Sequence, residues 1–160
     1  MLRNLLAEDH ATVQVWQEDY VAQHIRWWEN AYQTTAQNTP LQVAERDWEE
    51  LMAATTRADQ FVQVYGEKPL GIIYGRIRQD PYLGLPIGQL SWIYVDPESR
   101  GLGVADHLIQ GLFSWFSEQG VAGREVFVTA ANPAAVRVYE RHGFQVVDHR
   151  MLGPGIQSDS

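Results

Sequence analysis

Apolar side chains recur with a helical period over most of the first 58 residues. After a short initial strand, the segment 7–35 carries them at near-helical spacing, at Val13, Trp16, Tyr20, Trp27, Trp28 and Tyr32. Thr39 followed by Pro40 is typical of an N-cap and a first helical position, which predicts a second helix over 41–56. The pattern therefore predicts a helical segment from residue 1 to residue 58.

Strands dominate the pattern after residue 60. Two β-rich runs, 61–65 and 70–77, are separated by Gly-Glu-Lys-Pro, and we expect them to form an antiparallel hairpin. A third run, 89–95, ends at Asp96 and Pro97. The chain then alternates, with helices expected over 103–120 and 133–143 and strands over 124–130 and 144–152. This order predicts an α+β fold, an α/β/α sandwich around one mixed, mostly antiparallel sheet.

Length and composition narrow the class of protein. The 160 residues suit a single domain, 1–160, with the helical segment 1–58, a core over 61–152 and a polar tail over 153–160. Because the chain has no cysteine, disulfides, thiolate nucleophiles and Cys-ligated metal sites are excluded. No apolar run approaches the roughly 18 residues of a membrane span, so we expect a soluble cytoplasmic protein without a membrane partner. The net charge of -8 argues against a nucleic-acid partner.

The segment from Tyr94 to Ile109 has the features of an anion site. A strand stops at Asp96-Pro97, and a helix begins immediately after Gly101 and Gly103. The start of a helix exposes unpaired backbone N–H groups, and glycine removes the Cβ that would keep a ligand away. Arg100 would add a bidentate cation. The alternative is that the glycines only form a tight turn and that Arg100 is a solvated surface residue.

Two common nucleotide-binding motifs do not match the sequence of this turn. The dinucleotide fingerprint GxGxxG has Asp106 in its third glycine position, where a carboxylate would repel a pyrophosphate. No segment reads GxxxxGK[ST], and the only lysine of the chain, Lys68, lies in the predicted hairpin turn. The turn is therefore neither a dinucleotide fingerprint nor a P-loop.

The residues from Val95 to Leu108 resemble the acetyl-CoA signature of the GNAT superfamily of N-acetyltransferases. That signature is [R/Q]-x-x-G-x-[G/A] after a V-x-P strand end, and Arg100, Gly103 and Ala105 fill its fixed positions. A second motif downstream, Asn132 to Phe144, resembles the N-x-x-A-x-x-x-Y-x-x-x-G-F of the same superfamily. The resemblance covers residues 61–150, and it implies a GNAT fold whose sheet splays open at the acetyl-CoA site.

The resemblance also implies which residues hold the cosubstrate acetyl-CoA. Pantetheine would pair with the backbone of Ile93 and Val95, and amides from Gly101 to Ala105 would hold the pyrophosphate. The expected cofactor-binding residues are Ile93, Tyr94, Val95, Arg100, Gly101, Leu102, Gly103, Val104, Ala105, Asn132 and Tyr139.

Transfer of an acetyl group from a thioester to an amine needs a neutral amine, a stabilised oxyanion and a proton for the departing thiolate. By resemblance, Tyr139 is the catalytic residue that supplies this proton, with Ala135 one helical turn before it. Many relatives carry a glutamate where Gln89 stands, and an amide cannot accept a proton at neutral pH. We therefore expect a water chain that ends at an acidic residue of the helical segment. Alternatives are a CoA-binding regulatory module without turnover and transfer of a larger acyl group.

The acceptor is less well defined than the cofactor. In this superfamily the segment with Trp27, Trp28 and Tyr32, together with the loop of Tyr82, borders the acceptor pocket, although core packing is the more common use of each such residue. Residues 1–58 hold nine acidic and four basic residues, a balance that suits a cationic amine. None of the five histidines has the spacing of a metal site, so no metal is expected. A homodimer stays open.

Overall fold

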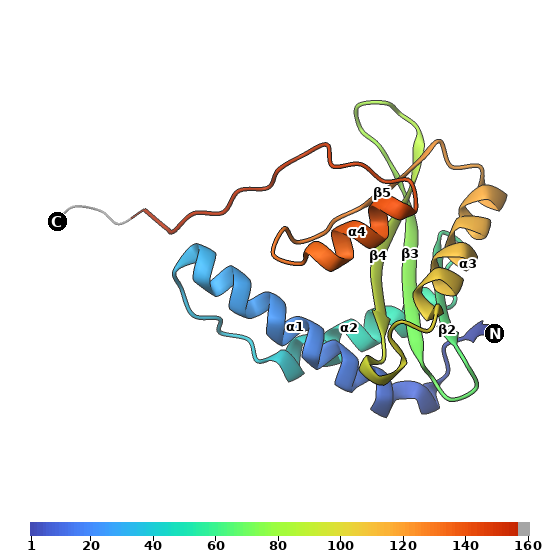
Figure 1. Cartoon of the computed structure of the whole chain (residues 1–160), viewed down its shortest axis with the longest axis horizontal. Helices are drawn as coiled ribbons and strands as arrows, with labels where there is room; N and C mark the ends of the chain where they lie inside the picture. Colours follow the sequence, from blue (N-terminus) through green and yellow to red (C-terminus); the bar gives the residue numbers. More distant parts are fainter. Residues whose placement is uncertain (157–160) are drawn as a thin grey trace.

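The computed structural model describes residues 1–156, which form an α+β fold around one five-stranded sheet (Figure 1). The first four strands are antiparallel neighbours, and the fifth pairs with the fourth in parallel. Their spatial order follows the chain: β1 (Leu2–Asn4), β2 (Gln60–Tyr65), β3 (Gly71–Gln79), β4 (Pro86–Val95) and β5 (Gly123–Val126). The predicted fold class and the predicted hairpin are confirmed.

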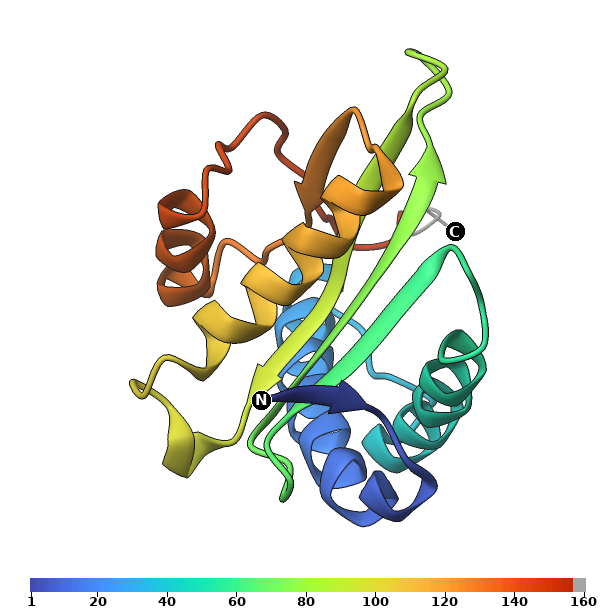
Figure 2. The ribbon, with the colours of Figure 1, turned by 90° about the vertical axis from the view of Figure 1, so that its right-hand side faces the viewer.

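Helices form layers on both sides of this sheet. Helices α1 (His10–Tyr32) and α2 (Pro40–Ala54) lie on one face, and α3 (Val104–Gln119) crosses the other (Figures 1 and 2). Helix α4 (Pro133–Arg141) lies beside the edge formed by β5. Two short 3-10 helices, η1 (Ala7–Asp9) and η2 (Pro97–Ser99), precede α1 and follow β4. The helix predicted over 7–35 is therefore divided between η1 and α1.

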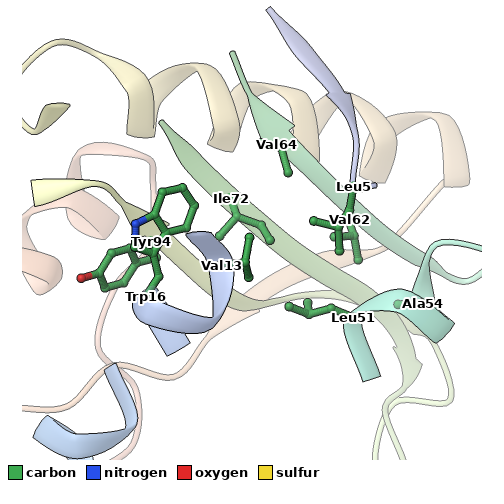
Figure 3. Close-up of a cluster of buried hydrophobic side chains, with 9 residues drawn as sticks. All are labelled: Leu5, Val13, Trp16, Leu51, Ala54, Val62, Val64, Ile72 and Tyr94. Atoms are coloured by element: carbon green, nitrogen blue, oxygen red, sulfur yellow. The ribbon is translucent and has the colours of Figure 1, made fainter. Parts of the chain in front are cut away.

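A first buried cluster fills the space between the sheet and helices α1 and α2 (Figure 3). Val13 and Ile72 are fully enclosed, and burial of one such side chain contributes about 1.5–3 kcal/mol. The rings of Trp16 and Tyr94 stack at a centroid distance of 5.6 Å. The members of this cluster are Leu5, Val13, Trp16, Leu51, Ala54, Val62, Val64, Ile72 and Tyr94. The cluster holds the end of β4 against α1.

A second cluster holds α3 against the opposite face of the sheet. Its helical members Val104, Leu108, Leu112 and Phe116 recur every four residues, which places them on one side of the helix. The helix approaches the sheet closely, since a Cβ on Gly75 would lie 2.5 Å from Leu112 Cδ1. This packing fixes the start of α3 next to the end of β4.

Strand β4 contains a β-bulge at Ser91. Trp92 is the partner of Tyr74 and Leu90 is the partner of Gly75, so Ser91 is an extra residue without a partner on β3. As a result, Ser91 and Trp92 line the same cavity although they are consecutive. Beyond the bulge, Tyr94 packs in the first cluster while Ile93 packs against the second.

Strands β4 and β5 pair over four residues and then part. Their register runs from Ile87 opposite Gly123 to Leu90 opposite Val126. The rest of β4, Ser91–Val95, has no β5 residue beside it. This parting confirms the predicted splay of the sheet.

The structure corrects two of the predicted strands. The strand predicted over 124–130 ends at Val126. The one predicted over 144–152 is absent: this segment has no regular structure, and Val147 is 74 % exposed. A strand pattern alone is insufficient, because no neighbouring strand offers its N–H and C=O groups to this segment. The segment instead runs past the end of α1 (Figure 1), where Arg150 Nη2 lies 3.4 Å from Tyr32 Oη.

Two further findings concern the ends of the chain and its helices. Of the tail predicted over 153–160, residues 153–156 have no regular structure, and 157–160 lie outside the described residues. Within residues 1–156, no helix combines the length and the apolar character needed to cross a bilayer.

An ion pair fixes β1 to the start of α1. Arg3 donates from Nη1 and Nη2 to the two carboxylate oxygens of Asp9, both at 2.8 Å, and from Nε to the carbonyl of Gly66 at 3.0 Å. The Asp9 carboxylate is almost fully enclosed and also accepts from the backbone N–H of Leu6 at 2.9 Å. The hydrogen bonds from Arg3, together with that from Leu6, hold the pKa of Asp9 below its usual range, against the opposing effect of burial.

We predict that Asp9→Asn lowers the free energy of unfolding at pH 7 by about 1–3 kcal/mol, because it removes a charge-assisted bidentate contact from a nearly enclosed site. A carboxyl whose pKa is lowered by folding stabilises the native state above its unfolded pKa of about 3.9, and this contribution is lost as pH falls through the folded value. The deficit should therefore be full at pH 6–7 and shrink below about pH 4. Urea denaturation at several pH values measures it, with the exposed Asp148→Asn as control. A pH-independent deficit would contradict this account.

Candidate active site

The parting of β4 from β5 leaves a stretch of strand backbone free on one side. Trp92–Val95 pair with β3 on their other side, so their unpaired N–H and C=O groups face the gap beside β5. An extended ligand could pair there in the manner of an added strand. The predicted cofactor-binding residues Ile93, Tyr94 and Val95 all lie in this stretch.

The turn between β4 and α3 places the other predicted cofactor residues at the end of this free stretch. Arg100 donates from Nε to the carbonyl of Val95 at 3.1 Å, and its guanidinium lies 5.3 Å from the centre of the Tyr94 ring. Gly101 and Gly103 have positive φ angles of 81° and 83°. A Cβ on either would meet no protein atom within 4 Å, so the turn is open to a ligand.

The start of α3 completes this turn. Gly103 is the N-cap of the helix, Val104 is its first residue and is buried, and Ala105 follows. Leu102 is 74 % exposed, at the outside of the turn. The backbone N–H groups of the first helical turn have no partner within the helix, which makes the site suitable for an anion such as a pyrophosphate.

Helix α4 holds Tyr139 in the second buried cluster. Asn132 caps the helix by accepting from the backbone N–H of Ala135 at 3.2 Å. Tyr139 is 9 % exposed, and within residues 1–156 its hydroxyl has no hydrogen-bond partner. Burial, and then the nearby phenol of Tyr20, raise the pKa of Tyr139 to about 12. The phenol is therefore a proton donor over the whole physiological range of pH.

A cavity of about 410 Å³ lies between the sheet and helices α1 and α2. Its volume is in the range of sites for small ligands. Its polar wall includes two carboxylates and two guanidinium groups. The lining residues are Gln17, Tyr20, Val21, Asp47, Glu50, Leu51, Arg57, Gln60, Tyr74, Arg76, Gln89, Ser91 and Trp92. Tyr139 is not among these residues, but the charge of Tyr20, which is, contributes to its raised pKa.

Three titratable groups of the cavity, Asp47, Tyr20 and Tyr74, have raised pKa values. Burial raises the pKa of Asp47, Arg46 opposes this, and Glu50 adds to it. Burial and then the charge of Asp47 raise the pKa of Tyr20. A carboxyl with a raised pKa in a cleft is suited to accept and release protons.

Gln89 connects β4 to both neighbouring strands. Its Oε1 accepts from Arg76 Nε at 2.7 Å, and its Nε2 donates to Glu125 Oε1 at 2.9 Å. Glu125 also accepts hydrogen bonds from Nε and Nη2 of Arg78, which lower the pKa of Glu125. Both ends of the Gln89 amide are thus used, and the residue orients Arg76 instead of serving as a base.

The aromatic residues expected around the acceptor lie elsewhere. Trp28 and Tyr32 line a separate cavity of about 210 Å³, and Trp27 stacks edge-on with His24 at 5.0 Å. Tyr82 is 96 % exposed in the turn between β3 and β4. Tyr20 and Trp92 line the 410 Å³ cavity instead.

The histidines have structural partners outside this cavity. His142 Nε2 lies 2.9 Å from Asp106 Oδ1, His107 stacks on Tyr65 at 5.1 Å, and His10 faces Trp48 at 4.6 Å. None lines the 410 Å³ cavity. In the part of the chain that is described, no group of three or more His, Asp or Glu side chains could hold a metal ion.

The sheet opens between two parallel strands, and a glycine-containing helix start lies beside the opening. Residues 13–144 match the acetyltransferase (GNAT) family, and the chain belongs to this family. Acetyl-CoA is the acetyl donor used by this family.

Curated relatives cover part of the chain. A mycothiol acetyltransferase from Brachybacterium faecium is 31% identical over 88 residues, which are 55% of this chain and 26% of that protein. The mycothiol acetyltransferase from Propionibacterium freudenreichii subsp. shermanii is 38% identical over 64 residues, 40% of this chain and 20% of that protein. The chain thus matches about a quarter or less of these relatives.

Solved structures share the fold over more of the chain. A protein from Bacillus halodurans described as a transcriptional regulator has a TM-score of 0.71 at 18% identity, covering 100% of this chain and 99% of that one. An aminoglycoside N-acetyltransferase solved with CoA has a TM-score of 0.59 at 18% identity, covering 72% and 88% of the two chains. At these identities the likeness shows the fold alone.

We predict that Gln89→Glu lowers the free energy of unfolding by about 1–3 kcal/mol at pH 7, because it replaces a hydrogen bond to Glu125 with a second carboxylate. Repulsion between the carboxylates opposes the lowering of the Glu125 pKa by Arg78, so the loss relative to wild type should diminish as pH falls toward 5 and one carboxyl takes up a proton. Thermal unfolding at pH 5 and pH 7 tests this, with Gln110→Glu on the exposed side of α3 as control. Equal loss at both pH values would show that Glu125 does not sense residue 89.

Proposed function

We propose that this chain transfers the acetyl group of acetyl-CoA to a primary amine of a small molecule or protein, by direct attack within a ternary complex. The observation that carries the proposal is the position of Tyr139, which lies in the second buried cluster with Leu90 and Val104 and beside Tyr20 at the 410 Å³ cavity. A cosubstrate along the free stretch of β4 and an amine in the cavity would then meet at Tyr139.

The chain's own atoms fit the shape and charge of acetyl-CoA. The free backbone of Ser91–Val95 offers strand-like pairing to the pantetheine amides. The amides from Gly101 to Ala105 suit the pyrophosphate, and a side chain on Gly103 would occupy the space that the phosphates need. Arg100 lies at the same turn, and Asn132 begins the helix that carries Tyr139.

Tyr139 acts as the general acid in this proposal. The amine nitrogen bonds to the carbonyl carbon, the carbon–sulfur bond breaks, and the departing thiolate takes the proton of Tyr139 Oη. A pKa of about 12 keeps the phenol protonated throughout the physiological range of pH, so the proton is present when the thiolate departs. A backbone N–H near Val95 stabilises the oxyanion without any side chain.

The proton released by the amine needs another route, because Gln89 cannot accept it. Asp47 of α2 lines the cavity beside Tyr20, and its raised pKa makes it a better base than an exposed aspartate. We assign the end of the water chain to this residue. Asp47 belongs to the helical segment, the most acidic part of the sequence.

Two alternatives remain to be separated by experiment. The replacement of the usual glutamate by Gln89, which is fully engaged in hydrogen bonds, favours a CoA-binding module without turnover. The curated relatives are named acetyltransferases, which supports acetyl over a larger acyl group.

We expect Gly103→Val to weaken CoA binding severely, because a branched side chain would stand where the phosphates approach and would also strain a backbone with φ of 83°. Gly120→Val is the matched control, since Gly120 ends the same helix with φ of 68° and equally open surroundings. Calorimetric titration with CoA compares the two variants. Similar affinities in both folded variants would remove the pyrophosphate from this turn.

We expect Tyr139→Phe to lower kcat by about 10²-fold, the low end for a general acid, because a thiolate is a tolerable leaving group. CoA affinity should stay nearly unchanged, since the ring packing is kept. Single-turnover transfer at saturating acetyl-CoA isolates the chemical step. With the phenol pKa at about 12, the wild-type rate should show no decline from phenol ionisation up to about pH 10. A wild-type rate in Tyr139→Phe would make the phenol structural.

A further inference from the structure

The 410 Å³ cavity has charges of both signs on different walls. Asp47 and Glu50 come from α2, whereas Arg76 comes from β3 and Arg57 follows α2 at the start of the connection to β2. The guanidinium groups of Arg57 and Arg76 would repel an acceptor that carries only positive charge. The cavity therefore offers partners for an acceptor that carries both charges.

Charged groups of both signs surround the tyrosines of the cavity. Burial raises the pKa of Tyr20, and the charge of Asp47 adds to this effect. Burial also raises the pKa of Tyr74, which Arg76 and Arg57 lower and Glu50 raises. Tyr74 donates a hydrogen bond to Gln60 of β2 at 2.9 Å. A ligand in the cavity would therefore meet carboxylates and guanidinium groups together.

Both arginines have donors to spare. Within residues 1–156 neither Arg57 nor Arg76 is paired with a carboxylate. Gln89 holds only Nε of Arg76 and thereby fixes the plane of the guanidinium, which leaves its two terminal nitrogens for a bidentate contact. Gln89 is buried, and its amide is fixed in turn by Glu125 and Arg78.

A third donor in the same wall lacks a partner. The indole Nε1 of Trp92 is buried and, among the described residues, has no hydrogen-bond acceptor. Trp92 lines the cavity together with Arg76, and a buried donor without an acceptor is costly. An oxygen-rich anionic group at this wall could accept from it.

We propose that the acceptor is a small amine that also carries a carboxylate, such as an amino acid or a short peptide, with its amine toward Asp47 and its carboxylate on Arg57 and Arg76. This inference rests on the proposed acetyl transfer and names the acceptor class of the same site. Arg76, oriented by Gln89, is the specificity-determining residue.

Acceptor pairs that differ only in the carboxylate test the proposal. We would measure kcat/KM at saturating acetyl-CoA for glycylglycine against glycylglycinamide, and for lysine against cadaverine. The carboxylate-bearing member should be better by roughly tenfold or more, the effect of one good ionic contact. Arg76→Gln should reduce this preference by about the same factor, and Arg76→Lys should restore part of it. Arg26→Gln, on an exposed part of α1, should leave the preference unchanged.

The proposal on the acceptor and the proposed function can fail separately. If both members of each pair are acetylated equally, or the preference survives in Arg76→Gln, the acceptor class is wrong while acetyl transfer stands. If no amine is acetylated, the proposed transfer is wrong. Calorimetric titration with CoA present then tests the acceptor class. Tighter binding of glycylglycine than of glycylglycinamide, with the difference lost in Arg76→Gln, supports the carboxylate contact. Equal or absent binding of the two peptides overturns it.

Discussion

The early parting of β4 from β5 is the constraint on which the rest of the site depends. A parallel pair that continued beyond Leu90 and Val126 would use the backbone of Ser91–Val95 for itself. Because β5 stops, that backbone is free, and the helix start at Gly103 and the phenol of Tyr139 lie around one opening. The packing of α3 against the sheet through residues such as Leu112 keeps this opening in place.

Gln89 stands where many relatives carry a glutamate, and its role differs from that of a base. Its amide joins Glu125 of β5 to Arg76 of β3, so the position serves to orient a cation. In the proposed site the base lies on α2, where Asp47 acts on the pKa of Tyr20 and is partly removed from water. Proton transfer and recognition of the acceptor would thus be divided between a helix and the sheet.

The parts of the site that sequence reasoning located are those encoded locally. The turn from Arg100 to Ala105 and the helix with Tyr139 are short segments whose spacing sets their geometry. The cavity could not be found this way, because Asp47 and Arg76 are brought together only by the packing of α2 on the sheet. The strand predicted over 144–152 failed for a related reason, since a strand depends on a neighbour that its own residues do not specify.

The bulge at Ser91 means that the chemistry of the cavity can vary with the length of β4 as well as with its composition. One inserted residue lets the side chains of Ser91 and Trp92 share a wall while Tyr94 still reaches the core beside Trp16. Loss of this single residue would turn every earlier side chain of the strand to the opposite face. One codon gained or lost here would exchange the part of the cavity wall that β4 supplies, Gln89 included, while Tyr74 and Arg76 of β3 would stay in place.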